Sequence, residues 1–210
     1  MQGKAVSLIM QVVKLNKLNQ TVIIKQAVDV LKQGGVIVYP TETAYGLGAD
    51  FLNPKAVKKV YQIKGRDFKK PLSVIVADLK MAQKLVKFNK ISLKLAKKHW
   101  PGALTLVLPR KAIVETGFKP VSTIALRVSS SKLATAIVKK INQPLTATSA
   151  NLSGKGELYS TMAVIKEFKN KKYQPDLIID AGRLPKIKPS TIAKIEKNKL
   201  EILRQGKIIV

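Results

Sequence analysis

The chain has 210 residues, enough for one well-buried core but barely enough for two domains. It carries 39 lysines and arginines against 12 acids, a formal net charge of +27, and its 46% hydrophobic content excludes a disordered chain. The lack of cysteine excludes disulfides, thiolate metal sites and cysteine nucleophiles, and it fits a reducing compartment. We predict a cytoplasmic protein with no signal peptide and no membrane-spanning segment.

The elements of the first half are expected to alternate between helices and short buried strands. Residues 1–20 show no firm pattern, and we interpret them as an N-terminal extension to a single domain over 21–210. Apolar spacing and caps predict helices at 21–35, 53–65 and 78–88, with strands at 36–40 and 72–77. The second of these helices has Asn53 as its cap, Pro54 at its first position and Gly65 at its exit.

Strands become more frequent in the second half. A turn at 100–102 precedes strands at 103–109 and 123–128. A helix follows at 130–142, capped by Ser130 or Ser131, and then a strand at 144–151 that runs into a polar loop. The last predicted elements are a helix at 161–168 and strands at 176–180, 190–195 and 201–205. This order predicts an α/β fold, an open twisted sheet of mixed direction with flanking helices.

The common nucleotide and metal motifs do not occur. There is neither a G-x-x-x-x-G-K-[ST] phosphate loop nor a G-x-G-x-x-G turn. His99 is the only histidine, so no zinc site of histidines and cysteines can form, and a Ser-His-Asp triad would need His99 at its centre. We interpret His99 as a packing residue.

Polar side chains instead gather where predicted strands and helices end. Thr41 follows the first buried strand, where open sheets bind ligands, and Lys64 and Arg66 end a helix. The helix dipole also explains basic residues at the end of a helix. The polar run 148–151 closes a predicted strand, and it also suits a helix cap or an Asx turn. Arg127 ends a half-buried strand and needs an acid or a ligand as partner.

The charge has two interpretations that the sequence leaves open. A strongly basic surface attracts polyanions such as tRNA or nucleotides, but it also arises from a lysine-rich composition. By type, 34 of the basic residues are lysines and five are arginines. Because the planar guanidinium binds phosphate and carboxylate in a bidentate way, the arginines are the better markers of a site.

Eight segments, taken in order, resemble one known family. They are YPTETAYGLGAD, KGR, KKPLSVIVAD, WPGALTLVL, IALRV, TSANLSG, PSTI and LRQGKI, and the resemblance as a whole runs from about Thr21 to Ile208. Their order and spacing resemble the YrdC/TsaC family of L-threonylcarbamoyladenylate synthases. The resemblance implies a YrdC-like sheet around a broad basic cavity. It also implies a nucleotidyltransferase reaction in which L-threonine, bicarbonate or CO2 and ATP give threonylcarbamoyl-AMP and pyrophosphate.

The resemblance also assigns roles to residues of this chain. For ATP it implies Lys64, Arg66, Thr123, Ser149, Asn151 and Arg204; for threonine it implies Thr41, Arg127 and Ser190. No protein nucleophile and no metal ligands are expected, because Mg²⁺ would be held mainly by the phosphates. Arg110 and Arg183 fall outside the motifs and are interpreted as surface residues.

Two departures and one alternative complete the sequence interpretation. Asp67 and Lys70 differ from what many relatives have, so threonine contacts within 67–74 are left open. We expect no extra C-terminal domain after LRQGKI, and partner proteins would transfer the threonylcarbamoyl group to adenosine of tRNA. The alternative is an RNA-binding module for double-stranded RNA or tRNA without nucleotide turnover, although 5% aromatic residues offer few stacking platforms.

Overall fold

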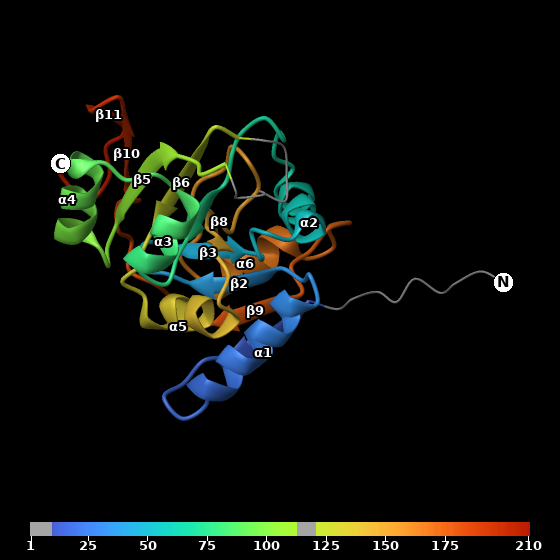
Figure 1. The fold of residues 1–210 in the computed structure, drawn as a ribbon. Coiled ribbons are helices and arrows are strands. Elements are labelled where there is room, and N and C mark those ends of the chain that lie inside the picture. The colour runs from blue at the N-terminus through green and yellow to red at the C-terminus, as the bar shows by residue number, and fades with distance from the viewer. Residues whose placement is uncertain (1–9, 113–120) are drawn as a thin grey trace.

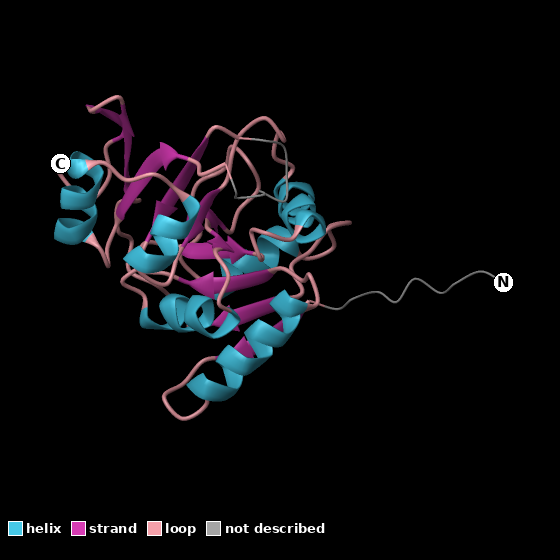
Figure 2. Ribbon diagram, in the orientation of Figure 1, coloured by secondary structure: helices cyan, strands magenta, loops and turns pink. Residues whose placement is uncertain are grey.

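Two mixed β-sheets with helices packed on their faces make up the fold (Figures 1 and 2). The structure, a computed structural model, describes residues 10–112 and 121–210. The predicted α/β class with mixed strand direction and flanking helices is confirmed. The strands, however, belong to two sheets, where the sequence predicted one.

The first sheet has five strands in the order β1-β9-β2-β3-β8. Its strands are β1 (Gln11–Lys14), β9 (Leu177–Asp180), β2 (Ile37–Pro40), β3 (Tyr45–Gly48) and β8 (Thr148–Ser149). β1 and β2 both pair parallel to β9, whereas β3 pairs antiparallel to β2 and to β8. No pattern in residues 1–20 predicted β1, and β3 was not predicted either.

The second sheet has six strands in the order β11-β10-β5-β6-β4-β7. Its strands are β11 (Lys199–Arg204), β10 (Thr191–Glu196), β5 (Leu104–Pro109), β6 (Thr123–Arg127), β4 (Ser73–Ile75) and β7 (Leu145–Thr146). The predicted strand at 144–151 is divided between the sheets, because β7 belongs to the second sheet and β8 to the first. This short segment therefore crosses from one sheet to the other.

The helices form three hydrophobic clusters with the sheets. They are α1 (Gln20–Lys32), α2 (Pro54–Lys64), α3 (Leu79–Leu85), α4 (Lys90–His99), α5 (Lys132–Ile141) and α6 (Thr161–Phe168). Apolar residues of α1 and α5 pack on one face of the five-stranded sheet, and those of α2 and α6 on its other face. α3 and α4 cover one face of the six-stranded sheet. Within the described ranges, no helix has the length and apolar character needed to cross a bilayer.

Local capping chemistry accounts for several helix ends. The Asn53 side chain accepts hydrogen bonds from the N–H groups of Lys55 and Ala56, and Gly65 ends α2 with φ +56°, as predicted. Of the two serines considered for α5, Ser131 is the cap. The sequence analysis missed α4, although Asn89 and Ser92 form a capping box at its start.

Alternation along the six-stranded sheet leaves one of its faces open. Leu106, Ile124 and Leu126 point into the cluster under α3 and α4. Successive side chains of a strand point to opposite faces, so their neighbours point away from that cluster. Thr105 and Arg127 are among these neighbours, and they line the cavity described below. The free face of this sheet is therefore one wall of the site.

Close packing of β3 against β2 requires glycine at position 48. A Cβ atom there would lie 2.6 Å from Cε1 of Tyr39 and 3.0 Å from Cγ of Leu145, and both of these side chains are fully buried. We expect Gly48→Ala to lower the free energy of unfolding by about 1–3 kcal/mol in denaturant titrations. Gly156→Ala is the matched control, since its Cβ would meet nothing within 4 Å. Equal stability of the two variants would contradict this packing.

Candidate functional site

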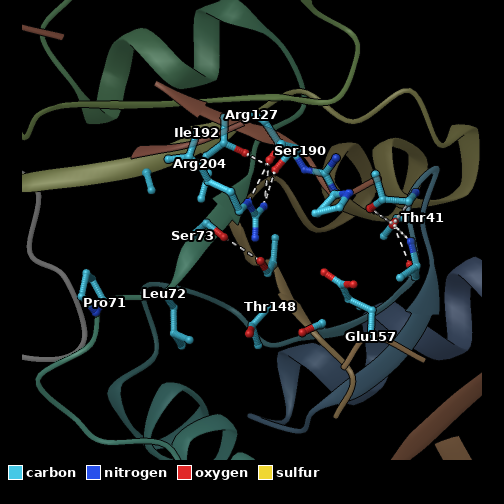
Figure 3. Close-up of a pocket in the computed structure, with 18 of the residues that line it drawn as sticks. Thr41, Pro71, Leu72, Ser73, Arg127, Thr148, Glu157, Ser190, Ile192 and Arg204 are labelled. Atoms are coloured by element: carbon cyan, nitrogen blue, oxygen red, sulfur yellow. Dashed lines mark hydrogen bonds between the residues drawn. The ribbon is translucent and has the colours of Figure 1, made fainter. Parts of the chain in front are cut away.

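A cavity of about 540 Å³ opens between the free face of the six-stranded sheet and strands β2, β3 and β8 (Figure 3). Its volume lies in the usual range for small-molecule sites. Its lining contains hydroxyl groups and the cations Arg66, Arg127, Lys194 and Arg204. A cavity walled by guanidinium and hydroxyl groups suits anionic and polar ligands.

Seven of the nine residues that the family resemblance assigns to ligands line this one cavity. They are Thr41, Arg66, Thr123, Arg127, Ser149, Ser190 and Arg204. These residues lie between positions 41 and 204 of the chain and come from both sheets and their loops, so the fold brings them together. Lys64 and Asn151 are not part of the lining; they are buried behind the wall that β8 forms.

Lys64, the last residue of α2, is 2% exposed and ties that helix to the chain after β8. Its Nζ donates to the backbone oxygen of Ser149 at 2.6 Å and to that of Asn151 at 2.7 Å. Burial, together with the nearby charge of Arg66, lowers the pKa of Lys64 to about 8. An ammonium has three N–H donors, so these two carbonyls leave one for a ligand.

Asn151 braces the loop that follows β8. Its Nδ2 donates to the backbone oxygens of Leu152, at 2.8 Å, and Lys155, at 2.6 Å. Its Oδ1 is buried and has no hydrogen-bond partner among the described residues. Because an unsatisfied buried acceptor is costly, a donor that reached this oxygen would stabilise the loop.

Arg127 is held by an ion pair across the two sheets. It ends β6 in the six-stranded sheet, and its Nη1 contacts Oε1 of Glu42, which follows β2 of the five-stranded sheet. The second carboxylate oxygen of Glu42 accepts the hydroxyl of Ser129. The side chains of Arg127 and Glu42 are 9% and 15% exposed. The acid partner that Arg127 was predicted to need is thus Glu42.

The other two arginines of the lining are fixed by backbone carbonyls. Arg204 donates to the oxygen of Ser190 from Nε, at 3.1 Å, and from Nη2, at 2.9 Å. Although the Arg204 residue is exposed overall, desolvation of its guanidinium lowers its pKa, and the charge of Arg127 lowers it further. Arg66 donates to the carbonyls of Lys70 and Pro71, at 3.2 and 3.1 Å.

Thr41 shapes the turn between β2 and β3. Its Oγ1 donates to the oxygen of Ala44 at 2.6 Å and accepts the N–H groups of Thr43 and Ala44, both at 3.2 Å. This local pattern is a side-chain turn of the kind threonine favours. Thr41 therefore fixes the loop that also carries Glu42 to its partner.

Sequence reasoning missed several residues of this region. Glu42 is one of these residues, and it forms the ion pair with Arg127. Two signals could have identified it: Arg127 needs an acidic partner, and Glu42 lies next to Thr41 within one of the family motifs. Glu157, Tyr159 and Lys194 also line the cavity, and no sequence pattern marked them.

Three further expectations concern residues away from the cavity lining. Arg183 is exposed, as expected, but Arg110 is half-buried and donates from Nε to the oxygen of Val121 at 2.7 Å. Arg110 is therefore only partly at the surface, and it lies outside the cavity lining. His99 ends α4 and does not line the cavity. Within the described part of the chain, no group of three or more His, Cys, Asp or Glu residues can hold a metal ion.

The fold and its anion-suited cavity define an α/β ligand-binding protein, and comparison with known proteins gives its family. The family model Sua5_yciO_yrdC, described as "Telomere recombination", matches residues 29–206. The chain belongs to this Sua5/YciO/YrdC family, which confirms the resemblance found in the sequence.

Relatives with a known name or structure support the same assignment. A Methanocaldococcus jannaschii protein, provisionally named a threonylcarbamoyl-AMP synthase, is 36% identical over 207 residues, 94% of each chain. The threonylcarbamoyl-AMP synthase of Pyrococcus abyssi is 34% identical over 87% of this chain and 54% of that protein. The structure of P. abyssi Sua5 complexed with L-threonine matches with a TM-score of 0.84 and 32% identity, over 94% of this chain and 57% of that one. The chain thus spans little more than half the length of the Pyrococcus proteins.

Loss of the Glu42 charge should destabilise the fold. In Glu42→Gln the buried guanidinium of Arg127 keeps its charge and loses the carboxylate, so we expect the free energy of unfolding to fall by about 3 kcal/mol in urea titrations. Glu196→Gln is the matched control, because Glu196 pairs with Lys194 in an exposed ion pair, and its stability should not change measurably. If both variants were as stable as the parent chain, the ion pair between Glu42 and Arg127 would not stabilise the fold.

Proposed function

We propose that the protein is a threonylcarbamoyl-AMP synthase, which condenses L-threonine, bicarbonate or CO2 and ATP to threonylcarbamoyl-AMP and pyrophosphate. The observation that carries this proposal is the convergence of Thr41, Arg127, Ser190, Arg204 and Arg66 in one cavity of a fold that matches Sua5 complexed with L-threonine. The names of the relatives point to the same reaction. They support it over an RNA-binding module without turnover.

We assign the threonine end of the cavity to Thr41, Arg127 and Ser190. Glu42 occupies part of the Arg127 guanidinium, and the remaining N–H groups are suited to a substrate carboxylate, with which arginine forms strong charge-assisted hydrogen bonds. The Ser190 hydroxyl lies 2.9 Å from that of Thr105, so either hydroxyl can turn toward the substrate.

We assign the nucleotide to Arg66, Thr123, Ser149 and Arg204 in the cavity wall, with Lys64 and Asn151 behind it. The phosphates would need to reach the remaining N–H of Lys64, and Asn151 can accept a donor of the nucleotide with its unpaired Oδ1. This arrangement places the cations on the phosphates, where negative charge develops as pyrophosphate leaves.

The chemistry requires positioning more than covalent help from the protein. The threonine nitrogen, as a neutral amine, forms a bond to the carbon of CO2 and loses a proton, which gives a carbamate. A carbamate oxygen then attacks the α-phosphorus and the bond to pyrophosphate breaks, so the protein must align the substrates and stabilise the leaving group. We propose that Mg²⁺ accompanies ATP and is held mainly by phosphate oxygens and water, since this ion uses few protein carboxylates. The lining is consistent with this, because it offers hydroxyls and cations and a single carboxylate among its described residues.

A synthase of this kind has a defined enzyme class and depends on further proteins. The enzyme would be a nucleotidyltransferase acting in the cytoplasm, with one catalytic domain whose sheet includes β1 before residue 21. Downstream proteins would transfer the threonylcarbamoyl group to tRNA, and the excess positive charge of the chain is compatible with a tRNA contact.

Pyrophosphate release tests the function directly. We expect release from ATP that depends on both L-threonine and bicarbonate, and a loss of at least about tenfold in Arg66→Ala and Lys64→Ala, because each removes a cation from the phosphates. Arg183→Ala, at an exposed position outside the cavity, should keep the parent rate. Folded protein that releases no pyrophosphate in response to threonine, yet binds tRNA tightly, would support the RNA-binding alternative.

The lowered pKa of Lys64 predicts a pH dependence of nucleotide affinity. With a pKa of about 8, Lys64 is mostly charged at pH 7 and mostly neutral at pH 9. A bound phosphate favours the charged form, so ATP binding above pH 8 must take up a proton, and affinity should fall by up to about tenfold per pH unit there. Calorimetry at pH 8.5 in two buffers of different ionisation enthalpy measures this uptake. Proton release, or no exchange, would show that Lys64 does not serve the phosphates.

A further inference from the structure

Glu157 is the one carboxylate among the described residues that line the cavity. It lies in the loop between β8 and α6, and its carboxylate extends into the open space of the cavity (Figure 3). The other charged residues of the lining are the cations Arg66, Arg127, Lys194 and Arg204. An acid in a cavity otherwise suited to anions calls for an explanation.

The carboxylate of Glu157 is not used by the fold in the way those of two other half-buried acids, Asp176 and Glu167, are. Asp176 accepts Nζ of Lys59 at 2.6 Å and the N–H of Val36 at 2.7 Å. Glu167 likewise accepts the N–H of Leu152, at 3.1 Å, and Nζ of Lys155, at 3.2 Å. These acids join distant parts of the chain, so their place in the fold is structural.

Glu157 has no comparable structural partner. Within residues 10–112 and 121–210, no lysine, arginine or histidine nitrogen lies within 4.0 Å of its carboxylate. Its one hydrogen bond comes from the hydroxyl of Tyr159 at 3.3 Å, two residues along the same loop. Burial raises the pKa of Tyr159 and the charge of Glu157 raises it further, and this charge also raises the pKa of Arg204 against the larger effect of burial.

A ligand that fills the cavity would remove water from this carboxylate. A desolvated carboxylate is costly unless a cation or hydrogen-bond donors replace the water. ATP is an anion, and it would be repelled by Glu157. Of the proposed substrates, only the amino acid carries a positive charge, on its α-ammonium.

We propose that Glu157 receives the α-ammonium group of the amino-acid substrate. The inference rests on the function proposed above and adds to it a contact for the amine of the substrate. Arg127 binds the carboxylate of the zwitterion, and Glu157 binds its ammonium from the loop after β8. The two charges of the site thus match the two charges of an α-amino acid, and ligands that lack the amine are discriminated against.

A magnesium ion is the competing ligand for this carboxylate. Mg²⁺ requires six oxygen ligands in near-octahedral geometry, and the described lining supplies one carboxylate. Four cations in the same lining oppose a divalent ion more strongly than a single ammonium charge. An ammonium also donates three hydrogen bonds. Besides Glu157, the cavity lining contains the hydroxyls of Thr148 and Tyr159, whose oxygens can accept hydrogen bonds.

The test compares two ligands that differ only by the amine. L-Threonine and (R)-3-hydroxybutyrate share the carboxylate and the hydroxyl, and their affinities are measured by calorimetry for the parent chain and for Glu157→Gln. We expect Glu157→Gln to weaken threonine binding by about ten- to a hundredfold and to leave (R)-3-hydroxybutyrate unchanged. The affinity for MgATP should also stay the same or rise slightly.

A matched control removes an equal charge elsewhere. Asp29→Asn acts on α1, where the carboxylate pairs with Lys25 in an exposed ion pair, and it should leave the binding of threonine and MgATP unchanged. If Glu157→Gln bound threonine as the parent does, or if it lost MgATP affinity instead, the role of Glu157 would be overturned while the proposed function stood. If the parent chain bound MgATP but no threonine, both would be overturned.

Discussion

The ion pair between Arg127 and Glu42 is the interaction on which the site most depends. It joins the end of β6 in one sheet to the turn after β2 in the other, across 85 positions of sequence. Burying a guanidinium in the wall of a cavity is costly without such a partner. The pair therefore sets where the two sheets meet, and with that the shape of the cavity between them.

A second buried cation has a similar role on the other side of the cavity. Lys64 connects the end of α2 to the segment that crosses between the sheets, through the backbone oxygens of Ser149 and Asn151. Arg204 and Arg66 are likewise held by carbonyl groups before any ligand is present. Side chains fixed in this way lose little freedom on binding, which favours both affinity and alignment of substrates.

The positive charge of the whole chain and the charge of the cavity come from different residues. Most of the excess is lysine, whereas the cavity contains three of the five arginines, held in defined positions. The lining also contains Glu157, which a purely attractive field for anions would exclude. Recognition in this cavity thus depends on where individual charges lie, and the net charge contributes mainly long-range attraction.

The sequence by itself determined most local elements, because their signals are local. Asn53, Pro54 and Gly65 mark α2 within thirteen residues, and apolar periodicity marks α1 and α5. Ordered motifs also identified the family and seven residues of the cavity. Local signals were weakest for β1, a short edge strand, and for β3, in which glycines occupy two of four positions.

Only the tertiary structure decided which residues meet. Four features depend on contacts between distant segments. They are the division of 144–151 between two sheets, the partner of Arg127, the burial of Lys64 behind the wall and the exposure of Glu157 to the cavity. A single sequence records the residue types but not these distances, because packing of complete sheets and helices fixes them. Seven residues of the cavity lining could therefore be named from the sequence, and their geometry could not.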